Sequence, residues 1–209
     1  MQTFRFTFIS GLIGGALLAG NALAADVITD WASVTAPPAP KLEAVTPDIK
    51  TTALLMLDFN SPPCDAEKRP RCVATIPAVK ALLDKARAKG MFVVYTLGGA
   101  TSTASIDQRI KPNETDPVFS SGPDKFLNTD LDKTLKEHGI KTVITVGTVS
   151  NGAVLYTASE AVFRGYDVIV PIDGCSAETP FGEQMTLWQL TSGPRLPGHV
   201  KLTRGEMIN

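Results

Sequence analysis

The sequence has 209 residues, of which 44% are hydrophobic and 20% are charged, as is typical of a single packed globular domain. Its 20 Lys and Arg residues nearly balance its 21 Asp and Glu residues, which gives a net charge of −1. This balance and the lack of a basic block argue against a nucleic-acid partner or an anionic membrane surface.

The first 24 residues, MQTFRFTFISGLIGGALLAGNALA, have the pattern of a secretory signal peptide. Arg5 precedes a short apolar stretch, and Ala22-Leu23-Ala24 has the small-residue pattern of a cleavage site. The apolar stretch is short for a membrane span, although an uncleaved anchor is the alternative. We predict residues 1–24 to be removed, leaving a periplasmic or secreted protein without a membrane attachment.

An exported chain meets oxidising conditions, which changes how its cysteines are interpreted. Cys64 and Cys72 flank a short polar loop, and we favour a disulfide between them over two reduced thiols. Cys175 is then the unpaired cysteine. The sequence has no CxxC motif and no Cys/His cluster, so we expect no metal site and no cofactor.

The remaining elements follow in chain order. Residues 25–50 are rich in Pro and Ala and lack periodicity, so we expect an extended N-terminal arm before a domain that spans residues 51–209. Apolar runs predict strands, and helically spaced apolar residues predict helices. The expected order is strand 52–59, helix 75–89, strand 91–97, an irregular segment 98–123, helix 128–139, strand 141–147, helix 151–165, strand 166–173, helix 181–190 and strand 199–204.

This alternation predicts an α/β fold, a three-layer α/β/α sandwich around a mainly parallel central sheet. Right-handed crossovers bring the carboxyl ends of the strands to one edge, where open α/β sheets bind ligands. Asp58, the turn after Val146 and the segment Asp173–Cys175 should meet at this edge. Asp58 ends an apolar strand, so it is either a structural cap or a catalytic acid or base.

Three segments resemble, in order and spacing, the isochorismatase-like hydrolases, also called the cysteine hydrolase superfamily. They are ALLMLDF (53–59), DKFLNTDLDKTLKEHGIKTVITVG (124–147) and SNGAVLYTASEAVFRGYDVIVPIDG (150–174). The resemblance covers roughly residues 50–205. It implies the fold expected above, a small-molecule substrate and a homo-oligomer.

The resemblance also implies where a catalytic triad would lie. The family combines an Asp after the first strand, a Lys before the middle helix and a Cys at the turn after the later strand. These positions correspond to Asp58, Ser120 and Ala153, and Lys125 could reach in from the loop in place of Ser120. Asn60 stands near the position of a family Gln.

Ala153 cannot form the acyl-enzyme of the family's amide hydrolysis, so that chemistry is disfavoured. True isochorismatases resemble this chain in having a small residue at the turn, and they cleave a vinyl ether with an Asp as acid. The resemblance therefore implies an exported hydrolase with Asp58 as general acid and Lys125 as its cationic partner. The alternative is a catalytically inactive member that binds a small ligand or a partner.

Several further residues are candidates for substrate contacts. The backbone N–H groups of Gly152 and Ala153 could bind an anion at a helix N-terminus, where we expect Ser150 to be the cap. Asn151 is either a cap or a ligand donor, Tyr156 belongs to the core or the pocket, and Cys175 is a buried apolar residue or a substitute nucleophile. The full set of expected substrate-binding residues is Asn60, Ser120, Asn151, Gly152, Ala153, Tyr156 and Cys175.

Overall fold

The computed structural model describes residues 26–99 and 102–209, and the predicted signal peptide lies outside this range. The chain divides into two compact units, Met1–Pro37 and Pro38–Asn209. In the predicted arm, residues 27–33 form turns and residues 34–44 have no helix or strand. None of the helices described is both long and apolar enough to cross a membrane.

The second unit is built on a seven-stranded sheet in which every pairing is parallel. The strand order is β3-β2-β1-β4-β5-β7, and β6 pairs with the end of β4. The strands are β1 (Thr52–Leu57), β2 (Phe92–Gly98), β3 (Val118–Ser121), β4 (Thr142–Thr148), β5 (Asp167–Pro171), β6 (Cys175–Ser176) and β7 (Val200–Thr203).

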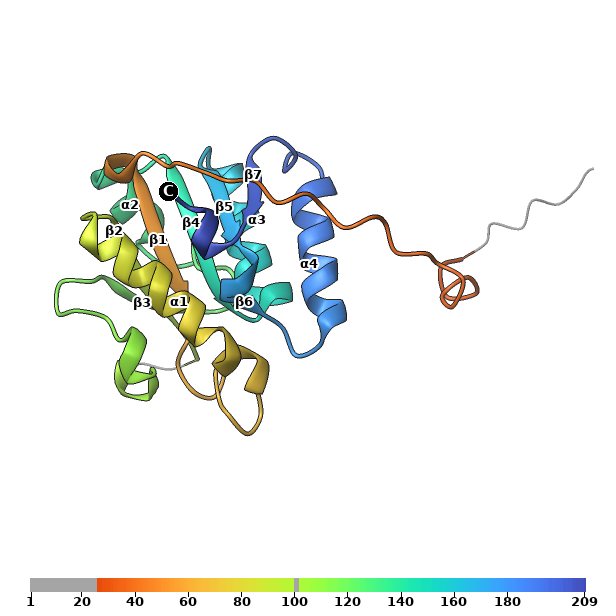
Figure 1. The fold of residues 1–209 in the computed structure, drawn as a ribbon, viewed down its shortest axis with the longest axis horizontal. Helices are drawn as coiled ribbons and strands as arrows, with labels where there is room; N and C mark the ends of the chain where they lie inside the picture. The colour runs from red at the N-terminus through yellow and green to blue at the C-terminus, as the bar shows by residue number, and fades with distance from the viewer. Residues whose placement is uncertain (1–25, 100–101) are drawn as a thin grey trace, which may run out of the picture. The chain divides into compact units, whose positions relative to one another are not determined.

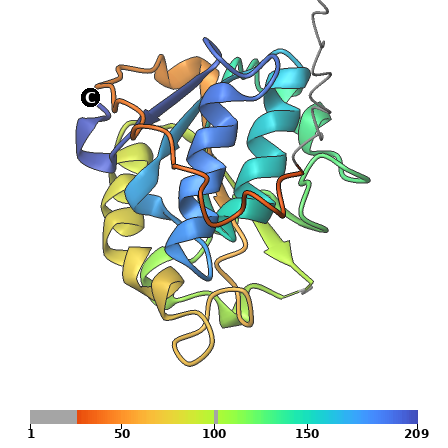
Figure 2. The same ribbon diagram turned by 90° about the vertical axis from the view of Figure 1, so that its right-hand side faces the viewer.

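Helices cover both faces of this sheet, which makes three layers (Figures 1 and 2). The helix α1 (Pro70–Ala88) lies on one face, and α2 (Leu131–Glu137), α3 (Leu155–Phe163) and α4 (Pro180–Ser192) pack on the other. The predicted three-layer α/β fold is therefore confirmed.

The alternation of side chains along β1 explains why its sequence is a continuous apolar run. Leu54 and Met56 belong to the core under α1, whereas Leu55 and Leu57 belong to the core under the other three helices. Every residue of β1 is buried. A parallel strand covered on both faces has no solvent side, so a polar residue would be costly at any position.

The direction of the chain through the sheet reverses beside β1. From β1 the chain steps outward through β2 to β3, then returns to the opposite side of β1 with β4 and continues to β5 and β7. The carboxyl ends of β1 and β4 therefore flank a topological switch point. Open α/β sheets bind ligands in the crevice at such a point.

Three local features differ from the sequence prediction. The helix α1 begins at Pro70, well before the expected residue 75, because proline suits the first turn of a helix. The segment 98–123 contains the short edge strand β3. A π-helical turn, Ser150–Val154, precedes α3, and Ser150 does not cap it: the N-cap is Val149, and the Ser150 hydroxyl is buried without a hydrogen-bond partner among the described residues.

Candidate active site

Asp58 follows β1 at the switch point and is 6% exposed. Its φ of 58° is in the left-handed region that non-glycine residues rarely adopt, and such strain is concentrated at functional sites. Both carboxylate oxygens are hydrogen-bonded. Oδ1 accepts from Oγ1 of Thr96 at 2.9 Å, and Oδ2 lies 2.7 Å from Nζ of Lys125.

Lys125 is fully buried behind Asp58. Its ammonium donates to the backbone oxygens of Gly122 at 2.7 Å and Ser121 at 3.5 Å as well as to Asp58. An ammonium has three N–H donors, and three protein oxygens lie within 3.5 Å of this one. The hydroxyl of Thr157 in α3 accepts from the backbone N–H of Lys125 at 3.3 Å and helps to fix the loop.

The surroundings of Asp58 act on its pKa in opposite directions. Burial is the largest effect and raises the pKa, while the charge and hydrogen bond of Lys125 and the hydroxyl of Thr96 lower it. The net effect raises the pKa above its ordinary value. A carboxyl group that keeps its proton to higher pH is suited to general-acid chemistry.

Gly98 leaves the space that the Asp58 carboxylate occupies. A Cβ at position 98 would lie 2.8 Å from Oδ2 of Asp58. Asn60 holds this end of β2, because its side-chain oxygen accepts from the Gly98 N–H at 3.0 Å and its amide donates to the Gly98 oxygen at 3.3 Å. Asn60 is completely buried and does not line the cavity in front of Asp58, so its observed role is to hold the end of β2.

A cavity of about 390 Å³ opens in front of Asp58 at the carboxyl ends of the strands. This volume suits a small organic molecule. The predicted residues Asp58, Gly152 and Ala153 all line it. The other lining residues are Pro62, Pro63, Lys68, Arg69, Gly98, Gly99, Ser121, Gly122, Pro123, Thr148 and Val149.

The turn after β4 presents a methyl group at the position where the family resemblance places a nucleophile. Ala153 is 3% exposed and lines the cavity. The Gly152 N–H donates to the Val149 oxygen at 2.9 Å, so it is not available for an anion as we had predicted. The same Val149 oxygen also accepts the π-type bond of the turn, from the Val154 N–H at 3.3 Å.

Three other predicted residues do not line the cavity. Ser120 is exposed on the edge strand β3, and its neighbour Ser121 lines the cavity instead. Asn151 is exposed and lies against Gly182 at the start of α4. Tyr156 is 50% exposed, so it belongs neither to the core nor to the cavity wall.

Cys175 is buried at the carboxyl end of β4, where it pairs with Gly147, but it does not line the cavity beside Asp58. Its thiol donates to the Thr145 oxygen at 3.6 Å and borders a separate cavity of about 120 Å³, together with Ser150 and Glu183. Burial raises the pKa of the Cys175 thiol to about 12. The nucleophilic thiolate is therefore scarce at neutral pH, and the position does not face Asp58.

Sequence reasoning missed Lys68 and Arg69 as cavity residues and Thr96 as a partner of Asp58. The structure contains the expected disulfide between Cys64 and Cys72, whose Cα atoms lie 5.3 Å apart, and the two cations belong to the loop that it closes. The sequence offered one indication of this role: Lys68 and Arg69 are adjacent cations within the loop that the predicted disulfide closes. Thr96 had no such signal, since it is one of several polar residues within buried strands.

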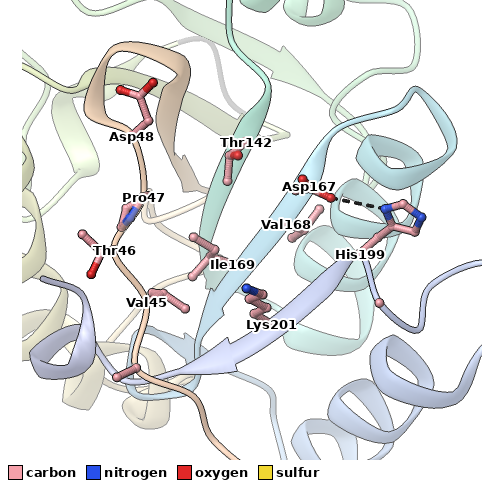
Figure 3. Close-up of a pocket in the computed structure, with 12 residues that line it drawn as sticks. Val45, Thr46, Pro47, Asp48, Thr142, Asp167, Val168, Ile169, His199 and Lys201 are labelled. Carbon is pink, nitrogen blue, oxygen red and sulfur yellow. Dashed lines mark hydrogen bonds and ion pairs between the residues drawn. The ribbon is translucent and has the colours of Figure 1, made fainter.

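A second cavity, of about 420 Å³, lies at the opposite edge of the sheet (Figure 3). It is bordered by the segment Ala44–Asp48 and by the first residues of β4, β5 and β7. In it the Asp167 carboxylate lies 3.2 Å from Nδ1 of His199, and both side chains are more than half exposed. This cavity lies away from the switch point and has no buried charge, so the cavity beside Asp58 is the better candidate.

Within residues 26–99 and 102–209, no group of three or more His, Cys, Asp and Glu side chains could hold a metal ion.

Comparisons with known proteins add a family match. The model of the isochorismatase domain matches residues 52–196. A secreted isochorismatase effector of Verticillium dahliae is 32% identical over 111 residues, which span 48% of this chain and 58% of the relative. The N-carbamoylsarcosine amidase of an Arthrobacter species is 26% identical over 143 residues, spanning 55% and 54% of the two chains. The chain thus matches little more than half the length of these curated relatives.

Solved structures share the fold. An isochorismatase family protein from Desulfovibrio vulgaris has a TM-score of 0.64 and 23% identity, with 75% of this chain and 95% of the other covered. A cysteine hydrolase from Pseudomonas syringae pv. phaseolicola has a TM-score of 0.67 and 20% identity, with 81% and 95% covered. At these identities the likeness is one of fold.

Proposed function

The chain belongs to the isochorismatase family, and on this premise we propose that it is an exported hydrolase of a small molecule that works without a cysteine nucleophile. We assign the general acid to Asp58. The observation that carries the proposal is the buried ion pair of Asp58 and Lys125 at a cavity that Ala153 also lines. We take Ala153 to stand at the nucleophile position that the family resemblance implies.

The chemistry that this arrangement favours is hydrolysis of an enol ether (a vinyl ether). Protonated Asp58 gives its proton to the terminal carbon of the double bond, and the carbon that bears the ether oxygen becomes an oxocarbenium ion. Water adds to this cation and returns one proton to the Asp58 carboxylate. The resulting hemiketal breaks its carbon–oxygen bond and releases an alcohol and a ketone. For an enol ether of pyruvate, the ketone is pyruvate.

Lys125 has a positioning role in this scheme. Its ammonium is directed at Asp58, Gly122 and Ser121, so it does not reach a substrate. When Asp58 loses its proton, the charge of Lys125 and the hydroxyl of Thr96 stabilise the carboxylate that remains. Burial therefore favours the protonated form of Asp58 before the proton transfer, and Lys125 and Thr96 stabilise its carboxylate after the transfer.

Amide hydrolysis through a covalent intermediate is less compatible with the site. One relative is named as an amidase, but the family's thiol chemistry needs a thiolate facing the carbonyl carbon. Ala153 has no such group, and the Cys175 thiol is buried at a different cavity with its pKa raised.

The alternative is a catalytically inactive family member that binds a small ligand or a partner. One observation favours it: each carboxylate oxygen of Asp58 and each donor of Lys125 already has a protein partner. A pair satisfied in this way could serve structure alone.

Export is supported by two findings. One relative is named as a secreted effector, and Cys64 and Cys72 form a disulfide of the kind that persists in oxidising compartments.

The test follows product release by the purified protein. Enol ethers, isochorismate among them, are assayed for pyruvate, and simple amides and ureides are assayed for ammonia. Asp58→Asn should abolish pyruvate release, whereas the matched control Asp167→Asn, an exposed aspartate at the opposite edge, should retain it. Absence of any turnover would favour the binding protein. Ammonia release that survives in Asp58→Asn would contradict the assigned chemistry.

A further inference from the structure

Lys125 lies in the segment 122–130 between β3 and α2, which forms neither helix nor strand. Such a segment has no ladder of backbone hydrogen bonds, so its position depends on bonds to side chains and to neighbouring elements. The ammonium of Lys125 nevertheless lies 2.7 Å from Oδ2 of Asp58, and the side chain is fully buried. Contacts that hold the Lys125 backbone are therefore needed to keep the ammonium beside the carboxylate.

Two threonines, which we call the threonine clamp, hold the backbone of Lys125 through both of its polar groups. The Thr157 hydroxyl accepts the Lys125 N–H at 3.3 Å, and the Thr129 hydroxyl donates to the Lys125 oxygen at 2.6 Å. Each hydroxyl has a second bond. Thr157 donates to the Pro123 oxygen at 3.4 Å, and Thr129 accepts the Leu131 N–H at 3.3 Å. A hydroxyl both donates and accepts, and each threonine uses it in both directions.

The threonine clamp joins Lys125 to two helices that pack on the central sheet. Thr157 is a fully buried residue of α3, four positions after Ala153, which lines the cavity. Thr129 lies two positions before α2, whose buried residues belong to the same core as α3. The position of Lys125 is therefore fixed relative to the framework that also carries Asp58.

We propose that Thr129 and Thr157 are positioning residues for the general acid, which hold the Lys125 ammonium against Asp58 through the Lys125 backbone. The inference rests on the proposed function, because the acid is the one assigned there. Neither threonine is among the described residues that line the cavity, so both act through Lys125 and not on a substrate. Lys125 in turn stabilises the carboxylate that remains after proton transfer.

The kinetic test uses Thr129→Val and Thr157→Val, which remove the hydroxyl and nearly keep the shape of the side chain. The probe is 2-methoxyacrylate, the methyl enol ether of pyruvate, and pyruvate release is followed. We expect kcat on the low-pH plateau to fall about tenfold while KM changes less than about twofold, as for an interaction that acts in the transition state. Thr129→Ser and Thr157→Ser keep the hydroxyl and should restore kcat.

The matched control is Thr186→Val. Thr186 is a buried threonine of α4 whose hydroxyl donates to the Gly182 oxygen at 2.8 Å, so its variant loses a similar bond away from Lys125 and should keep the wild-type kcat. Circular dichroism checks the fold of each variant. Thr129 is only half-buried, so Thr129→Val tests the clamp even if Thr157→Val does not fold.

The pKa of Asp58 tests the threonine clamp without turnover. It is measured by nuclear magnetic resonance from the ¹³C signal of the carboxyl group, which Asp58→Asn assigns. Lys125 lowers the pKa of Asp58, so an ammonium that is held less firmly lowers it less. The pKa should rise by about half a unit or more in both valine variants. It should keep the wild-type value in the two serine variants and in Thr186→Val.

The two readouts separate the threonine clamp from the proposed reaction. If wild-type protein releases no pyruvate but the pKa of Asp58 rises in the valine variants, the clamp stands and the proposed function fails. If pyruvate is released and the valine variants keep the wild-type kcat and pKa, the clamp is wrong and the reaction stands. A pKa that falls toward 3.8 would show that the segment opens and admits water to Asp58, which would overturn positioning through Lys125.

Discussion

Asp58 and Lys125 form an ion pair in which the carboxylate borders the cavity and the ammonium lies fully buried behind it. The pair joins the end of β1 to the loop after β3. It therefore ties the candidate acid to the loop that forms part of the cavity wall, while the Lys125 ammonium itself does not line the cavity.

Replacement of Lys125 by methionine should destabilise the protein strongly. Removal of one partner leaves the other buried without compensation, at a cost of about 3 to 5 kcal/mol in the free energy of unfolding. Urea unfolding at neutral pH measures this. The control is Lys80→Met, in an exposed pair with Asp84, which should cost at most about 1 kcal/mol. Equal losses in the free energy of unfolding would show that the buried pair contributes no more to stability than the exposed pair.

The rate of enol-ether hydrolysis should fall as the pH rises. Asp58 donates a proton only when it is protonated, and its pKa is raised above the ordinary value of 3.8. The value of kcat/KM should be level at low pH and should decrease about tenfold per pH unit above the raised pKa. Circular dichroism across the same range checks that the fold persists. A rate that increases with pH would mean that Asp58 acts as a base.

Thr96→Val should move that falling limb to higher pH. The Thr96 hydroxyl donates to Asp58 and lowers its pKa, so loss of the hydroxyl raises the pKa further. The matched control is Thr145→Val. Thr145 is equally buried in a strand, but its hydroxyl has no hydrogen-bond partner among the described residues. A similar shift in both variants would show that the effect does not come from the bond to Asp58.

Gly98→Ala should reduce kcat/KM by between about tenfold and 100-fold, because small displacements of reacting groups have effects of this size. The new methyl group would lie 2.8 Å from Oδ2 of Asp58 and 3.1 Å from Pro63. Steady-state kinetics with the best substrate measures the loss. Gly205→Ala is the control, since its nearest neighbour would be at 3.7 Å. Wild-type kinetics in Gly98→Ala would show that Asp58 can move without consequence.

Cys175 should resist alkylation in the folded protein. Its thiol is buried and has its pKa raised to about 12, so little thiolate is present for iodoacetamide to attack at mildly alkaline pH. Mass spectrometry should find no adduct before unfolding and one adduct in urea. Cys175→Ala should keep the wild-type kcat. Loss of turnover on native labelling would instead make Cys175 a participant.

The strands β1, β2, β4 and β5 were predictable because their buried segments are largely apolar runs. The strand β3 was not, since Val118–Ser121 is short, partly exposed and at the edge of the sheet. Its side chains do not have to be apolar, so they leave no pattern. The early start of α1 was missed because Pro70 and Arg71 belong to the short segment between the two cysteines, which we had interpreted as a loop.

The residue types of the site were easier to predict than their arrangement. Asp58 could be found because a charge at the end of an apolar strand is conspicuous. The choice between Ser120 and Lys125 depended on the path of a loop, and loop paths are set by tertiary contacts such as the one from Thr157 to the Lys125 backbone. Asn60 was given a role at the ligand because sequence does not reveal that it faces inward to Gly98.

Gly147 of β4 pairs with Leu57 of β1 and leaves no room for a side chain. A Cβ there would lie 2.1 Å from the backbone oxygen of Leu57, the residue before Asp58, so no side chain fits. The separation between the acid and the turn that bears Ala153 is thus set by main-chain contact alone. The residues that set the spacing of the two strands, Gly147 and Leu57, are thus different from the residue that the turn presents to the cavity, Ala153. A substitution at residue 153 would therefore change the group that the turn presents to the cavity, while the contact of Gly147 with Leu57 would keep the two strands at the same separation.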